Sequence, residues 1–194
     1  MKVVTWVAAV VVAVGAMVAA LVIVGTQLRD VSVAATDPAA TTPPPPADPG
    51  DPLRITIPAI DVDAALVPVG LKDDGAMQTP DFGLAAWYSP GPRPGEQGPA
   101  VVVAHVDSKA NGPDVFYRLR ELAAGDEVVV HYRTSAVTFV VTGKEQAPKT
   151  ALPANKIWNG ATTPVLRLIT CGGAFDRAAR SYLDNVIVYA DQLG

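Results

Sequence analysis

The sequence predicts a mostly β domain, either a barrel or a sandwich, that follows an apolar N-terminal segment and a proline-rich linker. Two observations predict this fold class. Residues 53–194 consist of short apolar or alternating runs that Gly, Pro and Asp separate, a pattern typical of strands and turns. The same residues contain no long amphipathic stretch of helical period and no internal repeat. Many short strands with little helix favour a mostly antiparallel β architecture.

The N-terminal segment, residues 1–28, is predicted to be a membrane anchor. Residues 3–25 carry no charge and are mostly Val and Ala, and at helical rise this length spans the roughly 30 Å hydrocarbon core of a bilayer. The charges flanking it favour an N-terminus inside the cell and a domain outside. A cleaved signal peptide is the alternative, with residues 32–34 as a cleavage site, but secretory apolar regions are shorter, about 7–15 residues. We therefore expect a single-pass protein of the cell membrane.

A linker is predicted at residues 29–52. Residues 36–52 contain seven prolines, which exclude helix and sheet ladders and leave an extended, polyproline-like stalk. The stalk has almost no apolar side chain larger than alanine, so it contributes nothing to a core. It would hold the domain, residues 53–194, away from the membrane.

The domain itself divides into predicted strands and one helical turn. The turn is expected at residues 115–122, where apolar residues follow a helical spacing. Strands are expected at residues 53–57, 62–67, 100–105, 127–132, 137–143, 165–170 and 185–189.

Charge and cysteine content exclude several functions. The net charge is −4, so the chain has no basic footprint for nucleic acid. The single cysteine, Cys171, excludes an intrachain disulfide and leaves a free thiol. Cys171, His105 and His131 lack the spacing of metal ligands, so neither a metal nor an organic cofactor is expected.

Cys171 and His105 each follow an apolar run, at residues 165–170 and 99–104. If these runs are neighbouring parallel strands, the thiol and the imidazole share one rim of the sheet. The chain after Cys171 then returns to a final strand, which brings Arg177 and Arg180 to the same rim.

This trio of groups fits nucleophilic catalysis. A free thiol of pKa near 8.5 is only about 3% thiolate at pH 7, so it needs a base, and an imidazole supplies one. A guanidinium donates hydrogen bonds to a developing oxyanion. Each residue also has a structural interpretation: Cys171 as an inert buried side chain and His105 as a satisfied polar strand end. His131 alternates onto a solvated strand face, and we expect no catalytic role for it.

Over nearly all of residues 53–194 the chain resembles sortases, cysteine transpeptidases whose nucleophile motif is T-L-x-T-C. Residues 167–171 read RLITC, so four of five positions match and Arg replaces the first Thr. The segments HVDS at 105–108, VFYRL at 115–119 and CGGAFD at 171–176 are similar to the actinobacterial class F group, with class E as the nearest alternative.

The resemblance implies a closed eight-stranded sortase-type β-barrel with short helical turns and a Cys171–His105–arginine site. It also implies cleavage of an LPxTG-like sorting signal of surface proteins between Thr and Gly. A thioacyl intermediate on Cys171 would then pass the acyl group to a cell-wall peptide amine.

The arginine departs from the family pattern. Many relatives place it in a Tyr-Arg-Asp-Asn segment, which here reads YLDN at residues 182–185, with Leu183 at that position. Arg180 is the predicted substitute and Arg177 the second choice. Because Arg180 and Leu183 differ by three residues, a regular strand would direct them to opposite faces, so irregular backbone is expected between Arg180 and Tyr182.

Two other functions remain open on the sequence. A sortase-fold binding module of the cell surface, catalytically weak, would account for the displaced arginine. An L,D-transpeptidase acting directly on peptidoglycan also uses Cys and His, but the Ser/His-Gly-rich segment that should precede its cysteine is missing here.

Overall fold

The computed structural model describes residues 48–194. The predicted anchor, residues 1–28, and residues 29–47 of the predicted linker lie outside the described residues, so both stay predictions. Among the described residues, the search for a helix of membrane-spanning length and apolarity found none.

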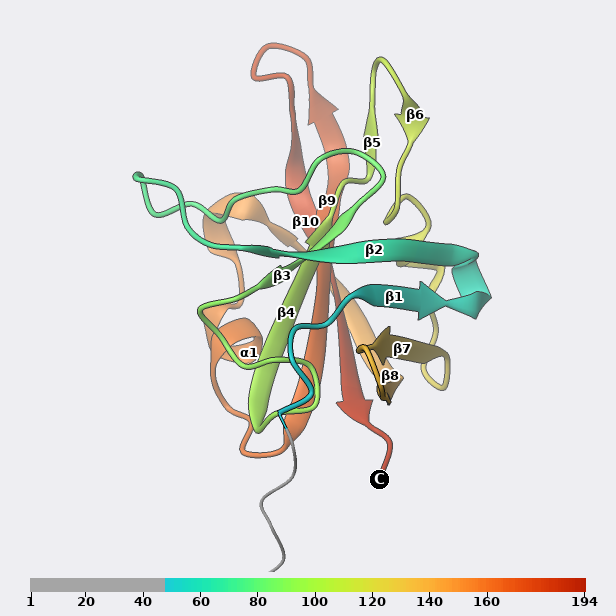
Figure 1. Cartoon of the computed structure of the whole chain (residues 1–194). Helices are drawn as coiled ribbons and strands as arrows, with labels where there is room; N and C mark the ends of the chain where they lie inside the picture. Colours follow the sequence, from blue (N-terminus) through green and yellow to red (C-terminus); the bar gives the residue numbers. More distant parts are fainter. Residues whose placement is uncertain (1–47) are drawn as a thin grey trace, which may run out of the picture. The chain divides into compact units, whose positions relative to one another are not determined.

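Eight strands of this part of the chain close into a β-barrel in the order β1-β2-β3-β4-β9-β10-β8-β7, and β1 closes the ring by pairing with β7 (Figure 1). A separate two-stranded hairpin, β5 and β6, follows β4. The barrel strands are β1 (Arg54–Ile57), β2 (Val62–Val69), β3 (Ala85–Tyr88), β4 (Gly98–Ala104), β7 (Glu127–His131), β8 (Ala136–Pro148), β9 (Pro164–Asp176) and β10 (Ser181–Gln192), and the hairpin is β5 (Asp107–Ser108) and β6 (Gly112–Pro113).

The predicted closed eight-stranded β-barrel is thus confirmed, and each predicted strand coincides with an observed one. Four short helices connect strands in the described residues: η1 (Pro58–Ile60), η2 (Leu119–Glu121), η3 (Lys149–Ala151) and α1 (Ala154–Trp158). The helical turn predicted at residues 115–122 is narrower, covering only η2. Sequence patterning missed β3 because its four residues, AAWY, lack apolar–polar alternation, and the first three are buried.

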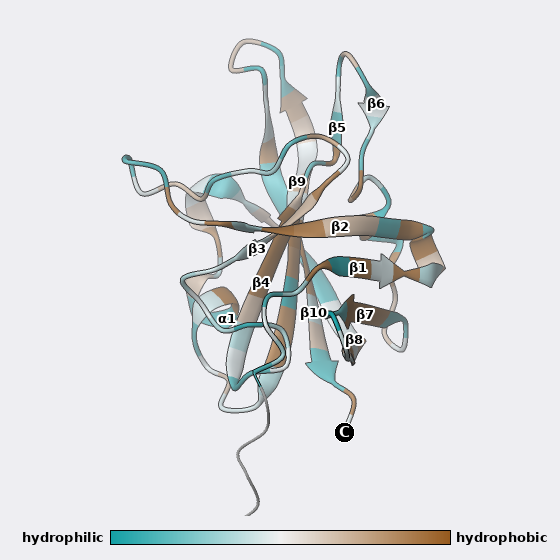
Figure 2. Ribbon diagram, in the orientation of Figure 1, coloured by the Kyte–Doolittle hydropathy of each residue, from teal (hydrophilic) through white to brown (hydrophobic). Residues whose placement is uncertain are grey.

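The apolar side chains form two layers, one inside the barrel and one on the outer face of β4, β9 and β10. Along β9, Leu166 and Leu168 belong to the inner layer, whereas Ile169 belongs to the outer one, as strand alternation requires. Figure 2 shows the apolar colour on β4, on β7 and along part of β2. Both faces of the β4–β9 region are therefore covered, which explains why these strands are mostly apolar on both faces instead of alternating.

Two strand pairs in the barrel are parallel, β2 with β3 and β4 with β9. In the second pair, Val103 lies opposite Ile169 at the end of the ladder. One residue further on, buried Thr170 donates from Oγ1 to the carbonyl oxygen of Ala104 across 2.8 Å. This bond extends the β4–β9 register by one residue, up to Thr170 and the end of β4.

Arg167, which replaces the first Thr of the family motif, has a structural role. It lies on the outer face of β9 with 9% of its surface exposed. Its Nε donates to the carbonyl oxygen of Lys156 across 2.9 Å, and its guanidinium lies 4.8 Å from the ring centroid of Tyr189. Because Lys156 belongs to α1, these contacts attach α1 to the sheet.

The boundary before the barrel is testable. Asp48 and Asp51 pair with Arg93 at 3.1 and 3.5 Å, and exposed pairs of this kind contribute about 1 kcal/mol or less each. Chains starting at residue 48 and at residue 53 should therefore both be soluble, monomeric and cooperatively folded. Their free energies of unfolding in urea should differ by no more than about 2 kcal/mol. Aggregation or a non-cooperative transition of the chain that starts at residue 53 would contradict the domain boundary.

Candidate active site

Cys171 is a free, half-buried thiol on β9. Its position continues the outer-face series of Arg167 and Ile169, two residues beyond the last pairing of β9 with β4. β9 itself does not end there: it continues to Asp176, paired with β10 as a two-stranded extension beyond the barrel (Figure 1). Cys171 therefore lies at the rim of the barrel, but inside a strand rather than at the strand end that the sequence predicted.

His105 is the residue that follows β4 directly. Val101 and Val103 belong to the outer layer, so alternation places His105 on the same face as Cys171. Its Nε2 lies 2.9 Å from the carbonyl oxygen of Pro80. Its ring stacks on Phe82, with the ring centroids 4.4 Å apart and the planes inclined by 19°. The sequence analysis missed both of these neighbours.

Cys171 and His105 line two cavities in common. The larger one, about 870 Å³, is lined by His105, Cys171, Arg177 and Arg180, together with Asp107 and Lys109 among others. The smaller one, about 130 Å³, is lined by His105 and Cys171 with mostly apolar neighbours, including Met77, Pro80, Val103 and Ile169. The residues predicted to act together thus surround one cavity, while their catalytic roles stay predictions.

The turn between β9 and β10 positions the arginines. Asp176 accepts hydrogen bonds from the backbone nitrogens of Ala178 and Ala179 at 2.7 and 3.1 Å, which closes the turn. Arg180 has a φ of 52°, the left-handed conformation that side-chain-bearing residues adopt rarely. The irregular backbone expected near Arg180 is therefore present, and both Arg177 and Arg180 line the large cavity.

Leu183, at the position of the family's arginine, lies where the β9–β10 register shifts between Tyr182 and Asp184. Its side chain is 52% exposed. A β-bulge removes a residue from regular alternation, so strand parity alone does not determine the direction of this side chain.

The two glycines after Cys171 permit close packing of β9 on β10. A Cβ atom on Gly173, whose φ is 76°, would lie 2.3 Å from Oδ2 of Asp184, and one on Gly172 would lie 2.8 Å from Val186. The close approach of the two strands therefore requires glycine at both positions.

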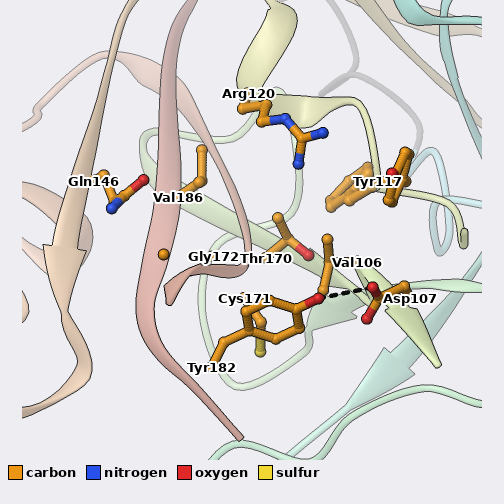
Figure 3. A pocket seen from close by; sticks show the side chains of 12 residues that line it. Val106, Asp107, Tyr117, Arg120, Gln146, Thr170, Cys171, Gly172, Tyr182 and Val186 are labelled. Carbon is orange, nitrogen blue, oxygen red and sulfur yellow. Dashed lines mark hydrogen bonds between the residues drawn. The ribbon is translucent and has the colours of Figure 1, made fainter. Parts of the chain in front are cut away.

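A third cavity, about 160 Å³, lies on the other side of Cys171 (Figure 3). Arg120 and Tyr117 line it, and the Arg120 guanidinium lies 5.1 Å from the Tyr117 ring centroid. At its edge Tyr182 donates to Asp107 across 2.7 Å, and this hydrogen bond raises the pKa of Tyr182 above its usual value. The sequence analysis did not single out these residues, because only the folded chain brings them to Cys171.

His131 lies elsewhere, at the end of β7, where its Nε2 is 3.0 Å from Oγ1 of Thr56. It lines none of the three cavities around Cys171. Within residues 48–194, no three His, Cys, Asp or Glu side chains group together as metal ligands would.

A half-buried thiol that lines one cavity together with an imidazole and two guanidinium groups has the residue types that cysteine enzymes use for acyl transfer. The family comparison agrees. A family model for the sortase domain matches residues 55–193, and the chain belongs to the sortase family, whose members are generally cysteine transpeptidases.

Solved structures of sortases share the fold. A Sortase D5 transpeptidase from Clostridium perfringens is 17% identical, with a TM-score of 0.55 over 74% of this chain and 79% of that one. The pilus-related Sortase C of Group B Streptococcus is 14% identical, with a TM-score of 0.57 over 74% and 68%. A lid mutant of Sortase A from Corynebacterium diphtheriae is 16% identical, with a TM-score of 0.58 over 74% and 70%. The comparison with curated proteins gave no match.

Proposed function

We propose that this chain is a cysteine transpeptidase that cleaves an LPxTG-like sorting signal between Thr and Gly and transfers the acyl group to a cell-wall amine. The resemblance of its motifs to the actinobacterial class F sortases supports a proposal of that subclass, with class E as the alternative. The observation that carries the proposal is the common rim of parallel β4 and β9, where His105 and Cys171 line the same cavities.

In the first half of the reaction, His105 takes the thiol proton and the sulfur attacks the Thr carbonyl carbon. The tetrahedral intermediate collapses as the C–N bond breaks and His105 returns the proton to the departing glycine amine. In the second half, an acceptor amine attacks the thioester, His105 removes its proton, and the Cys171 thiolate leaves. Arg180 donates hydrogen bonds to the oxyanion in both halves.

Under this proposal, the two cavities that Cys171 and His105 share would bind different parts of the substrates. The small cavity is lined by Met77, Pro80, Val103 and Ile169, apolar side chains that suit the Leu and Pro of a sorting signal. The large cavity holds the cationic groups and is wide enough for an incoming amine and its peptide. The anchor of residues 1–28 would keep this site on the outside of the cell membrane, close to surface proteins and wall peptides.

A sortase-fold binding module is the second candidate function. The observation that favours it is Leu183 in place of the family's arginine, because a site that lacks a donor at that position would bind a sorting signal and react slowly.

The nucleophile decides between these two candidates. Residues 48–194 incubated with an LPxTG peptide and a small amine should give the amine-linked product, and a mass-shifted acyl-Cys171 should be trapped. Cys171→Ala should abolish both and leave the unfolding transition nearly unchanged, because a thiol-to-methyl change removes little volume. Full activity in the Ala variant would refute the thioacyl mechanism, whereas an inactive wild-type domain would favour the binding module.

The two histidines form a matched pair for the proton-transfer role. His105→Ala should lower the rate of product formation by about 10² to 10⁴-fold, the usual contribution of general acid–base catalysis. His131→Ala should change it little, because His131 lies at the end of β7 and outside the cavities around Cys171. Equal losses in the two variants would show that the effect of His105 is on folding rather than on proton transfer.

The arginine is tested by lysine substitutions, which keep a charge and lose the two-pronged donor geometry. Arg180→Lys should lower the rate about 10² to 10³-fold, the usual cost of losing an oxyanion donor, while Arg177→Lys stays mild. Arg120→Lys tests the cavity on the other side of Cys171. If Arg177→Lys or Arg120→Lys is instead the crippled enzyme, that residue is the catalytic arginine.

A further inference from the structure

The strongest unexplained feature of the site is the environment of His105. Its Nε2 lies 2.9 Å from the carbonyl oxygen of Pro80. A carbonyl oxygen only accepts hydrogen bonds, so Nε2 must carry a hydrogen and donate it. In the neutral imidazole the lone pair is then on Nδ1. The contact therefore selects one of the two tautomers.

The Phe82 ring fixes the plane of the same imidazole. The two rings are nearly parallel, inclined by 19° with centroids 4.4 Å apart. The Phe82 side chain is 44% exposed, so core packing does not explain its position. A hydrogen bond in the ring plane and a stack on the ring face together restrict both torsions of the His105 side chain.

The loop that carries these two contacts is itself held against the segment that follows His105. The backbone nitrogen of Gly83 donates to Oδ1 of Asp114 across 2.9 Å, and that of Leu84 closes a turn on the carbonyl oxygen of Asp81 across 3.2 Å. The backbone N–H of Asp114 in turn donates to the carbonyl oxygen of Val106, the residue after His105, across 2.9 Å. The loop and the segment that holds His105 therefore share one anchor.

We propose that Pro80 and Phe82 are positioning residues that hold His105 as the Nε2–H tautomer, so that Nδ1 is the atom that exchanges the proton during catalysis. This inference rests on the proposed roles of Cys171 and His105. The proton of Sγ–H moves to Nδ1 as the sulfur forms its bond to the Thr carbonyl carbon. Nδ1–H then gives that proton to the glycine nitrogen as the C–N bond breaks. Nε2–H stays on the Pro80 carbonyl throughout.

The tautomer can be observed without any turnover. The full chain, ¹⁵N-labelled at histidine and held in detergent micelles, contains only His105 and His131, and a His131→Gln variant assigns the two spin systems. At a pH where the rings are neutral, His105 should show a protonated Nε2 and an unprotonated Nδ1. Phe82→Ala should mix the two forms, while the His131 signals stay unchanged. An Nδ1–H tautomer in the wild type, or an unaltered His105 in Phe82→Ala, would overturn the proposal.

Kinetics then connect the tautomer to the reaction. Phe82→Ala and Phe82→Leu should lower kcat about 10- to 100-fold with little change in KM, because a misdirected catalytic group costs up to about 10². Phe82→Tyr keeps the flat ring and should restore a rate near that of the wild type. Leu71→Ala is the matched control, since Leu71 lies on the same β2–β3 connection and is 49% exposed.

Other kinetic outcomes separate the alternatives. A raised KM with unchanged kcat would make Phe82 a substrate contact and refute its positioning role. A faster Phe82→Ala variant would mean that the loop obstructs His105 instead of orienting it. A wild-type chain that forms no acyl-Cys171 would refute the proposed function, and the tautomer of His105 would still decide the role of the loop.

Discussion

The buried hydrogen bond from Thr170 to the carbonyl oxygen of Ala104 fixes the register of β4 and β9 where their pairing ends. Cys171 follows Thr170 and His105 follows Ala104, so this bond and the parallel ladder behind it set the separation of the thiol from the imidazole. Neighbouring strands lie about 4.8 Å apart, which brings the two groups close without any loop between them. An unpaired hydroxyl at this buried position would cost about 1–3 kcal/mol, so the arrangement resists slippage of one strand along the other.

The barrel strands alone do not complete the site, because they determine neither the orientation of the His105 ring nor the positive charge around Cys171. Orientation comes from the connection between β2 and β3, through Pro80 and Phe82. Positive charge comes from the β9–β10 turn, where Arg180 takes a left-handed conformation. Three separate parts of the chain thus set the distance between the thiol and the imidazole, the orientation of the imidazole, and the positive charge around them. Only the distance depends on regular secondary structure.

This division explains how much of the site the sequence could predict. The meeting of Cys171 and His105 at one rim was predictable because each follows a mostly apolar run, and neighbouring parallel strands covered on both faces are the simplest reason for such runs. Phe82 was not, because its contact with His105 joins residues in a loop and at a strand end, which no periodicity relates. Arg120 was hidden for a similar reason: its cavity forms only when η2 is placed beside β9. β3 was missed since a buried strand of four residues leaves no alternation to detect.

Leu183, which stands where the family has its arginine, shows how the requirements on the imidazole and on the arginine differ. Proton transfer requires hydrogen-bond geometry, so His105 has no substitute at another position. The proposed oxyanion contact also requires donor geometry, but an arginine side chain is long enough to bring its guanidinium to the same point from several backbone positions. The bulge at residues 182–184 already removes Leu183 from regular alternation, so parity does not single out that position. Under the proposed function, an arginine elsewhere on the cavity wall, such as Arg177 or Arg180, would supply the hydrogen-bond donors from a backbone position other than that of the family's arginine.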